Sequence, residues 1–306
     1  MKAARIHSFG RSAKVKIEDA PMPNLRRGMA LVRVRAAGVN PVDWMERDKI
    51  YNPRGTDRLP LTLGQDVAGV IEEVAPGTRT SLRRGDEVFG SAWGAFAQYV
   101  AAPVKDLVRK PRRITFVEAA AIPLTALTAW QVVVDTARAS PAKVFLIHGA
   151  SGGVGAFAAQ FALWKGARVV ATASRPSFPF LERIGVQVLI DYKKERFEKK
   201  VTGVDVVIDP VGGATQARSW KCLMKGGMLI NLIGEIDRAA ARKAGVRAVD
   251  FGFHYDLRDL NQIAALVERG IVRPHVSKVL PLSRVETALD MNEEGRSHGK
   301  IVLKVS

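Results

Sequence analysis

The chain is poor in the residue types that build metal centres and disulfides. Its 306 residues include one cysteine, Cys222, and five histidines scattered along the sequence. A single cysteine excludes an internal disulfide and a cysteine-clustered zinc site, because such a site takes several thiolates at once. Reduced cysteine fits a reducing compartment, so we expect a cytoplasmic protein.

Long hydrophobic runs are also missing. No apolar stretch approaches the ~18 residues that span a bilayer. The start, MKAARIHSFG, carries basic residues but lacks the apolar segment of a secretion signal. We therefore expect no membrane partner.

Acidic residues are outnumbered, with 30 Asp and Glu against 47 Lys and Arg and a net charge of +17. The excess is spread along the chain, which favours an ordinary solvated surface. Weak binding to a polyanion such as RNA is the alternative. It is disfavoured because no aromatic-rich RNA-binding motif is visible.

Three zones with different patterns are present. Residues 1–122 hold short β-like runs between glycine and proline signals. Residues 123–272 alternate apolar strands with helical periodicity, which predicts βαβ units and a mostly parallel sheet. Residues 273–306 return to strand, amphipathic helix and strand, and could close back onto the first zone. The predicted fold class is α/β, with a doubly wound parallel sheet beside a β-rich domain.

A glycine-rich turn, within IHGASGGVGAFAAQ (147–160), joins the first strand of the parallel series to its first helix. Glycines let the backbone turn tightly and approach a diphosphate, whose charge then lies against free N–H groups at the helix start. The residues expected to bind the diphosphate are Ala150, Ser151, Gly152, Gly153, Val154 and Gly155. A plain tight turn is the alternative reading.

The end of the next strand indicates which nucleotide would bind. In an NAD site an Asp or Glu about 20 residues after the turn holds the ribose 2′-hydroxyl. Here the strand ends with Ser174 and Arg175 and has no carboxylate. Hydroxyl and guanidinium groups suit a 2′-phosphate, so NADPH is favoured over NADH. The alternative is that Arg175 is an ordinary surface charge.

Seven segments, in order along nearly the whole chain, carry a family resemblance. They are AAGVNPVDW (36–44), LPLTLGQDVAGVIEEVAPG (59–77), RRGDEVFG (83–90), AAAIPLTALTAWQ (119–131), HGASGGVG (148–155), DPVGG (209–213) and HGKIVLKV (298–305). The chain resembles the zinc-independent quinone oxidoreductases, the zeta-crystallin-like branch of the medium-chain dehydrogenase/reductases. The resemblance implies a GroES-like catalytic domain of residues 1–122 and 273–306, a Rossmann NADPH-binding domain of residues 123–272, and a homodimer.

Metal-dependent relatives have a cysteine where this chain has Asn40, and a His-Glu pair where it has Gln65 and Asp66. Neutral Asn and Gln are poor zinc ligands, so we expect no metal. Without one, hydride from C4 of NADPH would pass to a quinone or to the β-carbon of an α,β-unsaturated carbonyl compound.

The resemblance also implies residues that face the acceptor. The Asn40 amide could donate to the acceptor oxygen, where negative charge develops. Tyr51 is a candidate second donor or proton source, whereas a second tyrosine of the family is Met45 here, which suggests a changed acceptor preference. The residues expected to line the substrate are Trp44, Met45, Gln65 and Trp93. The alternatives are that Asn40 only shapes the turn before Pro41 and that the two tryptophans only pack.

Further cofactor contacts follow from the resemblance. Beyond the glycine turn they are Thr128, Ser174, Arg175, Tyr192, Asp209, Val211, Leu232 and Lys300. Two other residues are expected to be structural: His148 as a satisfied buried imidazole, and Cys222 as inert packing. The rival functions are an NADPH-binding protein with little turnover, in a sensor or crystallin-like role, and an RNA-associated protein.

Overall fold

The computed structural model describes residues 1–295 and 297–305. The chain divides into two compact units, Met1–Leu127 with Tyr255–Ser306, and Thr128–His254. The segment 255–272, expected in the parallel-sheet domain, groups with the first unit. Its helix α8 (Leu257–Glu268) is attached there because Glu268 Oε2 accepts a hydrogen bond from Arg112 N at 2.7 Å.

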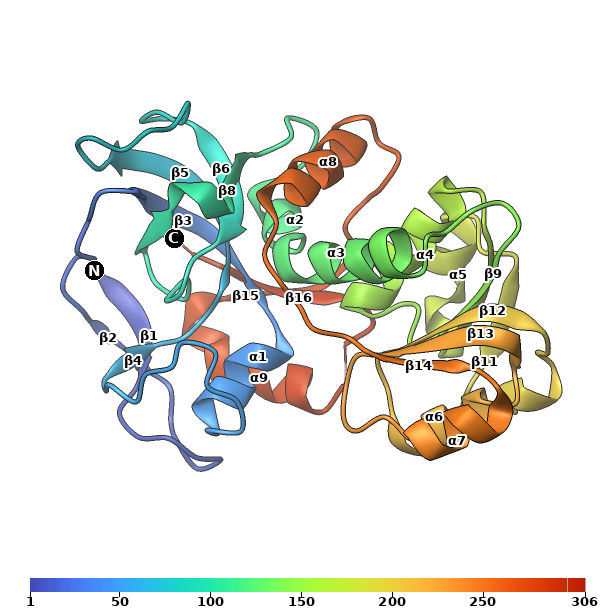
Figure 1. Ribbon diagram of the computed structural model, residues 1–306. Helices are drawn as coiled ribbons and strands as arrows, with labels where there is room; N and C mark the ends of the chain where they lie inside the picture. Colours follow the sequence, from blue (N-terminus) through green and yellow to red (C-terminus); the bar gives the residue numbers. More distant parts are fainter. Residues whose placement is uncertain (296, 306) are drawn as a thin grey trace. The chain divides into compact units, whose positions relative to one another are not determined.

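A mixed sheet forms the core of the first unit, in the order β15-β16-β3-β5-β6-β8 with β7 paired to β3 (Figure 1). Its strands are β3 (Met29–Val39), β5 (Asp66–Val74), β6 (Glu87–Ser91), β7 (Tyr99–Pro103), β8 (Leu107–Arg109), β15 (Val276–Pro281) and β16 (Lys300–Lys304). The apolar run 86–102 contains two strands, β6 and β7, because residues 92–98 leave this sheet. The C-terminal zone closes onto the first as expected, since β16 pairs antiparallel with β3.

Smaller elements complete the first unit. A second sheet has the order β2-β1-β4. The remaining elements are β1 (Lys2–Ile6), β2 (Lys16–Asp19), β4 (Leu61–Thr62), α1 (Pro41–Arg47), η1 (Val104–Asp106), α2 (Phe116–Ala120), η5 (Leu282–Arg284), α9 (Val285–Glu293) and α3 (Pro123–Trp130), which runs into the second unit. Helix α2 packs closely on β3, since a Cβ on Gly38 would lie 2.2 Å from the carbonyl oxygen of Ala120.

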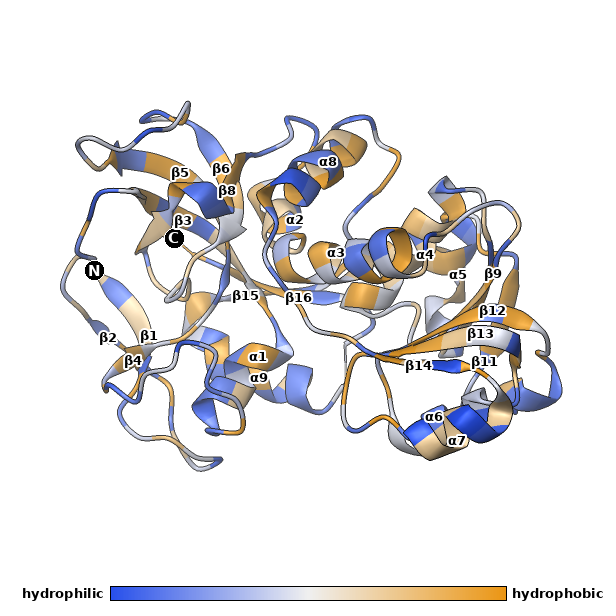
Figure 2. Ribbon diagram, viewed as in Figure 1, coloured by the Kyte–Doolittle hydropathy of each residue, from blue (hydrophilic) through white to orange (hydrophobic). Residues whose placement is uncertain are grey.

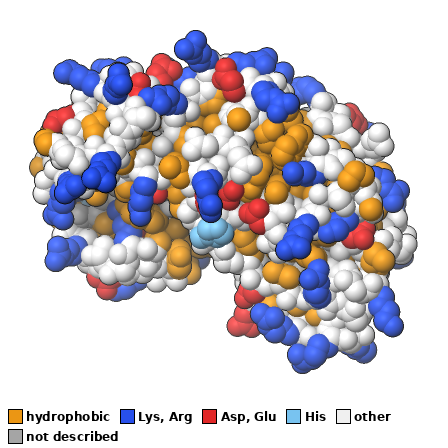
Figure 3. Space-filling view, turned by 45° about the horizontal axis from the view of Figure 1, so that its top comes forward, with side chains coloured by type: hydrophobic (Ala, Val, Ile, Leu, Met, Phe, Trp, Pro, Cys, Tyr) orange, Lys and Arg blue, Asp and Glu red, His pale blue; other side chains and the backbone are white. Residues whose placement is uncertain are grey.

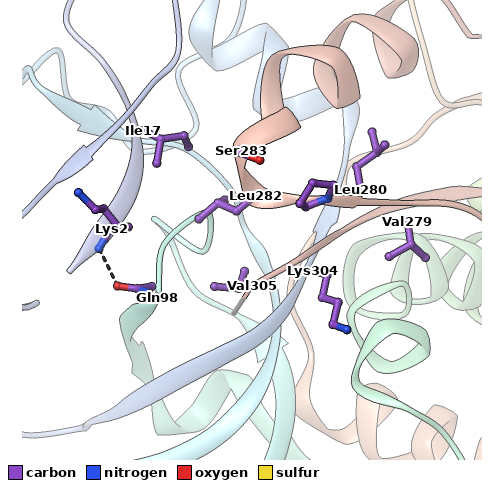
Figure 4. Close-up of a pocket in the computed structure, with 10 residues that line it drawn as sticks. Lys2, Ile17, Gln98, Val279, Leu280, Leu282, Ser283, Lys304 and Val305 are labelled. Atoms are coloured by element: carbon purple, nitrogen blue, oxygen red, sulfur yellow. Dashed lines mark hydrogen bonds between the residues drawn. The ribbon is translucent and has the colours of Figure 1, made fainter.

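A pocket of about 540 Å³ lies in the first unit, beside β15 and β16 (Figure 4). Its apolar wall includes Ile17, Val279, Leu280, Leu282 and Val305. None of its lining residues is among those expected to bind substrate or cofactor. The volume of this pocket therefore does not identify the functional site.

The second unit contains a parallel sheet in the order β11-β10-β9-β12-β13-β14. Its strands are β9 (Val144–Ile147), β10 (Arg168–Ala173), β11 (Val188–Asp191), β12 (Val204–Asp209), β13 (Leu223–Asn231) and β14 (Arg247–Asp250). Figure 2 shows β12 and β13 as largely hydrophobic ribbons. Strands that are buried on both faces typically have such continuous apolar sequences.

Helices cover both faces of this sheet, which confirms the doubly wound prediction (Figure 1). They are α4 (Gly153–Trp164), α5 (Phe178–Arg183), α6 (Gly213–Ser219) and α7 (Arg238–Ala244), with short turns η2 (Gln131–Thr136, π-helical), η3 (Arg175–Ser177) and η4 (Phe197–Lys199). Strand β9 lies between β10 and β12, so the order of the strands reverses beside it. Ligands of such sheets bind at this reversal, outside the carboxyl ends of the strands.

His148 and Cys222 have the structural roles expected of them. The His148 ring lies 3.0 Å from Thr172 Oγ1 and 2.9 Å from Ser219 Oγ, and burial lowers its pKa to about 3. Burial also raises the pKa of the Cys222 thiol to about 11. Both side chains are therefore neutral at physiological pH. Among residues 1–295 and 297–305, no helix combines the length and apolarity needed to cross a membrane.

Candidate active site

The glycine-rich turn follows β9 and leads directly into α4. Gly149 has a positive φ of 55°, and Gly152 N donates to Gly149 O at 2.8 Å. A Cβ on Gly155 would lie only 2.4 Å from Gly149 O, so the first turn of the helix can pack on the loop only with glycine at this position. The helix begins at Gly153, with Gly152 as its N-cap.

This turn has the features that a diphosphate requires. The first N–H groups of a helix lack intrahelical acceptors, and α4 runs for 12 residues behind them. Gly152, Gly153 and Val154 are half-buried, whereas Ala150 and Ser151 are buried. The turn also lies where the strand order reverses. The residues present thus fit a dinucleotide diphosphate.

The ends of β10 and β11 form a cationic corner beside this turn. The two strands are parallel, with Ala173 paired to Asp191, so Ser174 and Tyr192 follow neighbouring positions. Arg175 is exposed, and its guanidinium lies 5.0 Å from the ring centre of Phe178. Ser174 is buried, whereas the Tyr192 side chain is 52% exposed. An arginine and a phenol are thus available for a ribose phosphate, without a carboxylate at the end of β10.

Asp209 shapes the loop after β12. Its buried carboxylate accepts hydrogen bonds from Val211 N and Gly212 N, both at 2.9 Å, through Oδ1. Oδ2 is buried without a hydrogen-bond partner, and burial raises the pKa of the carboxyl group. Leu232 N donates to the backbone oxygen of Asp209 at 3.0 Å. The structure therefore brings together the predicted residues Asp209, Val211 and Leu232.

In the first unit, Asn40 belongs to a buried polar cluster built at three strand ends. Asn40 follows β3, Asp66 begins β5 and Lys300 begins β16. Lys300 Nζ lies 2.5 Å from Asn40 Oδ1, 2.8 Å from Val39 O and 3.6 Å from Asp66 Oδ2. All three side chains are at most 4% exposed. We call Asn40, Asp43, Asp66 and Lys300 the Asn40 cluster.

Asp43, on α1, completes the Asn40 cluster. Its Oδ2 accepts a hydrogen bond from Asn40 N at 2.8 Å, so Asp43 holds the start of the helix to the end of β3. Burial raises its pKa to about 8, and the nearby charge of Asp66 adds to this effect. Burial likewise raises the pKa of Asp66 and lowers that of Lys300, while the attraction between these two groups opposes both shifts. At neutral pH Asp43 is thus mostly protonated, while Lys300 and Asp66 form the ion pair of the cluster.

The side-chain amide of Asn40 has one oxygen and two N–H donors, which have different surroundings. The Asn40 amide accepts from Lys300 through Oδ1, while Nδ2 is buried without a well-formed hydrogen bond. Burial raises the pKa of Asp66, while the charge of Lys300 and a side-chain hydrogen bond from Asn40 lower it, so one Nδ2 donor is directed toward this carboxyl group. A buried N–H that lacks a full partner costs free energy, and such groups occur where a ligand supplies the acceptor.

The residues expected to line the substrate have different environments. Trp44 packs against the core, and its Nε1 donates to Asn292 Oδ1 at 3.2 Å, as the packing alternative states. Met45 is half-buried and Gln65 is buried. Trp93 is 39% exposed, with the Arg54 guanidinium 4.9 Å from its ring centre, and Tyr51 is 55% exposed. Of these side chains, Tyr51 and Trp93 are the most accessible.

Two features of the site were not predicted from the sequence. Lys300 was expected at the nucleotide, but its ammonium faces three oxygens of the first unit, and an ammonium has only three N–H donors. These oxygens of the first unit are the contacts that the structure gives Lys300, and its contact with the nucleotide stays a prediction. The Arg54–Glu46 ion pair, at 2.7 Å with Glu46 buried and Arg54 half-buried, was not anticipated. The signal for the Lys300 contact was the pairing of the last strand with β3, which a register prediction would have supplied.

The side chains that could bind a metal are not gathered into a metal site in the described part of the chain. Among residues 1–295 and 297–305, no group of three or more His, Cys, Asp or Glu side chains is arranged to hold a metal ion. Asn40 and Gln65 occupy the positions where, by the family resemblance, metal-dependent relatives have zinc ligands. The Asn40 side chain already accepts a hydrogen bond from Lys300. The chemistry of this donor set does not fit zinc.

Comparison with known proteins assigns the family. The models for an alcohol dehydrogenase GroES-like domain and for a zinc-binding dehydrogenase match residues 26–112 and 184–303. The tomato (Solanum lycopersicum) 2-methylene-furan-3-one reductase is 33% identical, covering 99% of this chain and 79% of that protein. The NADPH-dependent alkenal/one oxidoreductase of Arabidopsis thaliana chloroplasts is 32% identical, with the same coverage.

A solved structure agrees with these sequence matches. The quinone oxidoreductase from Coxiella burnetii superposes with a TM-score of 0.91 at 31% identity, covering 100% of this chain and 99% of that one. The likeness thus includes both units, from the GroES-like sheet to the parallel sheet. The chain belongs to the medium-chain dehydrogenase/reductase superfamily of oxidoreductases, with quinone oxidoreductases and alkenal or enone reductases as its relatives.

Proposed function

We propose that this protein is an NADPH-dependent reductase of quinones or α,β-unsaturated carbonyl compounds that works without a metal. The observation that carries the proposal is the corner at the ends of β10 and β11. There Arg175 and Tyr192 are exposed, and no carboxylate ends β10. The names of the relatives, which include an NADPH-dependent alkenal/one oxidoreductase and a quinone oxidoreductase, support the same reaction class.

The second unit would hold the cofactor. The helix start at Gly152–Gly155 would bind the diphosphate, and Arg175 with Ser174 would bind the 2′-phosphate. Tyr192 would pack on the adenosine end, and the loops at Asp209–Val211 and Leu232, with Thr128, would contact the rest of the dinucleotide. When bound, NADPH supplies a hydride from C4 of its nicotinamide ring.

The first unit would act on the acceptor. Reduction places negative charge on the acceptor oxygen, and a preorganised N–H donor stabilises that charge. The Asn40 Nδ2 group is the proposed donor. The oxygen of the same amide, Oδ1, already accepts a hydrogen bond from Lys300, which fixes the direction of Nδ2. The exposed Tyr51 hydroxyl is the proposed second donor or proton source. Trp93 and Met45 would contact the apolar part of the acceptor.

The proposal is tested with purified protein and two acceptors, 1,4-benzoquinone and trans-2-nonenal. We expect acceptor-dependent loss of NADPH absorbance that is at least ten times faster than with NADH and insensitive to a chelator. Equal rates with NADH would contradict the role of Arg175. Tight NADPH binding without turnover on either acceptor would favour the sensor or crystallin-like role instead.

A further inference from the structure

A buried lysine fixes the orientation of the Asn40 amide. An ammonium group has N–H donors and no acceptor, so only the amide oxygen can face Lys300 Nζ at 2.5 Å. The Nδ2 donors must then point away from the lysine, and one of them is directed toward the carboxyl group of Asp66. We propose that Lys300 is a positioning residue, which holds Asn40 so that its other N–H donor faces the acceptor oxygen. This inference rests on the proposed function, in which Asn40 is the donor.

The register of the sheet makes this contact rigid. Ile301 pairs with Val39 in the antiparallel ladder between β16 and β3, which places Lys300 opposite Asn40. Side chains of directly opposed residues lie on the same face of such a pair, close enough to interact. Asp66 lies beside them because it pairs with Gly38 on the other edge of β3. Groups held by strands are positioned more exactly than groups held by loops.

Charge balance allows the lysine to stay buried. Asp66 lies 3.6 Å from Lys300 Nζ, and its Oδ1 accepts from Leu124 N at 3.1 Å. A buried cation without such a partner would be strongly destabilising. Asp43 is mostly protonated at neutral pH, so it adds little charge to the pair. The ion pair with Asp66 therefore favours the ammonium form of Lys300, which donates to Asn40.

The contact also strengthens the donor. Hydrogen bonds in a chain polarise one another, so an amide oxygen that accepts from a cation leaves its N–H groups more acidic. Lys300 would thus favour the charged acceptor through Asn40, without touching it. A lysine that only balances Asp66 would have no such effect on the reaction. The two roles are separated by removing both charges together.

The test is the full-length Lys300→Met/Asp66→Asn variant. It leaves no uncompensated charge, so we expect it to fold and to melt cooperatively. With 1,4-benzoquinone we expect kcat to fall at least about 10-fold, while the Kd for NADPH changes less than twofold. A double variant with wild-type kcat would show that Lys300 only balances charge, and would overturn the inference. Lys304→Met, the same change at an exposed position of β16, should keep wild-type kcat.

A mutant cycle identifies the residue through which Lys300 acts. In an Asn40→Ala background, we expect the added double substitution to lower kcat no further, because the group that Lys300 positions is gone. Independent, multiplicative losses would contradict the inference. If Asn40→Ala alone kept full kcat, the proposed donor role would fail. If Asn40→Ala were slow but the double variant fast, only the positioning role would fail.

A spectroscopic readout tests the orientation without turnover. With ¹⁵N-labelled asparagine, the Asn40 side-chain signal is assigned by its loss in Asn40→Ala. We expect two well-separated Nδ2 proton resonances in the wild type, and averaged or broadened ones in the Lys300→Met/Asp66→Asn variant. An unchanged, sharp pair in that variant would show that Lys300 does not hold the amide.

Discussion

At the residue scale, burial of Asp43 links the Asn40 cluster to pH. Its pKa rises from 3.8 to about 8, chiefly because burial disfavours the carboxylate. A raised folded-state pKa gives a contribution to stability that is complete below pH ~4 and is lost as the pH rises towards 8. Ionisation of Asp43 therefore lowers the stability of the folded protein at alkaline pH.

Replacing this carboxyl group by an amide should flatten that dependence. Asp43→Asn keeps an oxygen that can accept from Asn40 N, but it cannot ionise. Between pH 5 and 8 we expect the variant to gain roughly 3–4 kcal/mol relative to the wild type, at 1.36 kcal/mol per pH unit. Urea unfolding at several pH values measures this difference. Parallel stability curves for the two proteins would contradict the prediction.

Arg175 should select the phosphorylated nucleotide. Loss of a charge-assisted contact with the 2′-phosphate costs about 1.5–3 kcal/mol, so Arg175→Ala should raise the Kd for NADPH roughly 10–100-fold. The Kd for NADH, which lacks that phosphate, should change little. Fluorescence titration gives both constants. The matched control is Arg183→Ala, an exposed arginine that also lies over a phenylalanine ring and should leave both unchanged. A similar loss for both nucleotides would point to a general charge effect.

At the scale of elements, the junction of β9 and α4 depends on one glycine. A Cβ at position 155 would lie 2.4 Å from Gly149 O and 2.7 Å from Ala150 Cα, both backbone atoms that cannot turn aside. Gly155→Ala should therefore destabilise the second unit by about 1–3 kcal/mol and weaken NADPH binding. Gly252→Ala is the control, because no atom lies within 4 Å of its Cβ position. Equal melting temperatures for the two variants would contradict the close packing.

Hydrophobic periodicity predicted the strands and helices better than it predicted which strands pair with one another. The apolar runs of the parallel sheet and the glycine turn were readable, because each strand and its following helix are local features. The split between β6 and β7 was not, since residues 92–98 keep the same composition while leaving the sheet. The contact of Lys300 with Asn40 joins residues 260 positions apart, so only the pairing of β16 with β3 reveals it.

At the scale of the whole molecule, we predict a homodimer through the edge strand β14. It ends the parallel sheet, and an unpaired edge is a template for another strand. Sedimentation should give twice the mass of one chain. Hydrogen exchange should then protect the amides of β14 more than those of β11, the opposite edge of the same sheet. A monomer with equal exchange at both edges would contradict the prediction.

The basic surface is the second property of the whole molecule. Lys and Arg side chains are scattered over the face seen in Figure 3 and do not form one dense patch. Such a distribution supports solubility more than recognition of a nucleic acid. Any binding to RNA should accordingly be weak at low salt and vanish as the salt concentration rises. Salt-sensitive RNA binding in a filter-binding assay that competes with NADPH would favour the RNA-associated role.

Transfer of deuterium from the cofactor to an α,β-unsaturated aldehyde tests the central claim most directly. With NADPH deuterated at C4 on the transferred side and trans-2-nonenal as the acceptor, mass spectrometry reports where the label goes. We expect one deuterium at the β-carbon of the saturated product, formed without added metal. A saturated product without the label, or label found only in unconsumed NADPH, would contradict hydride transfer by this protein.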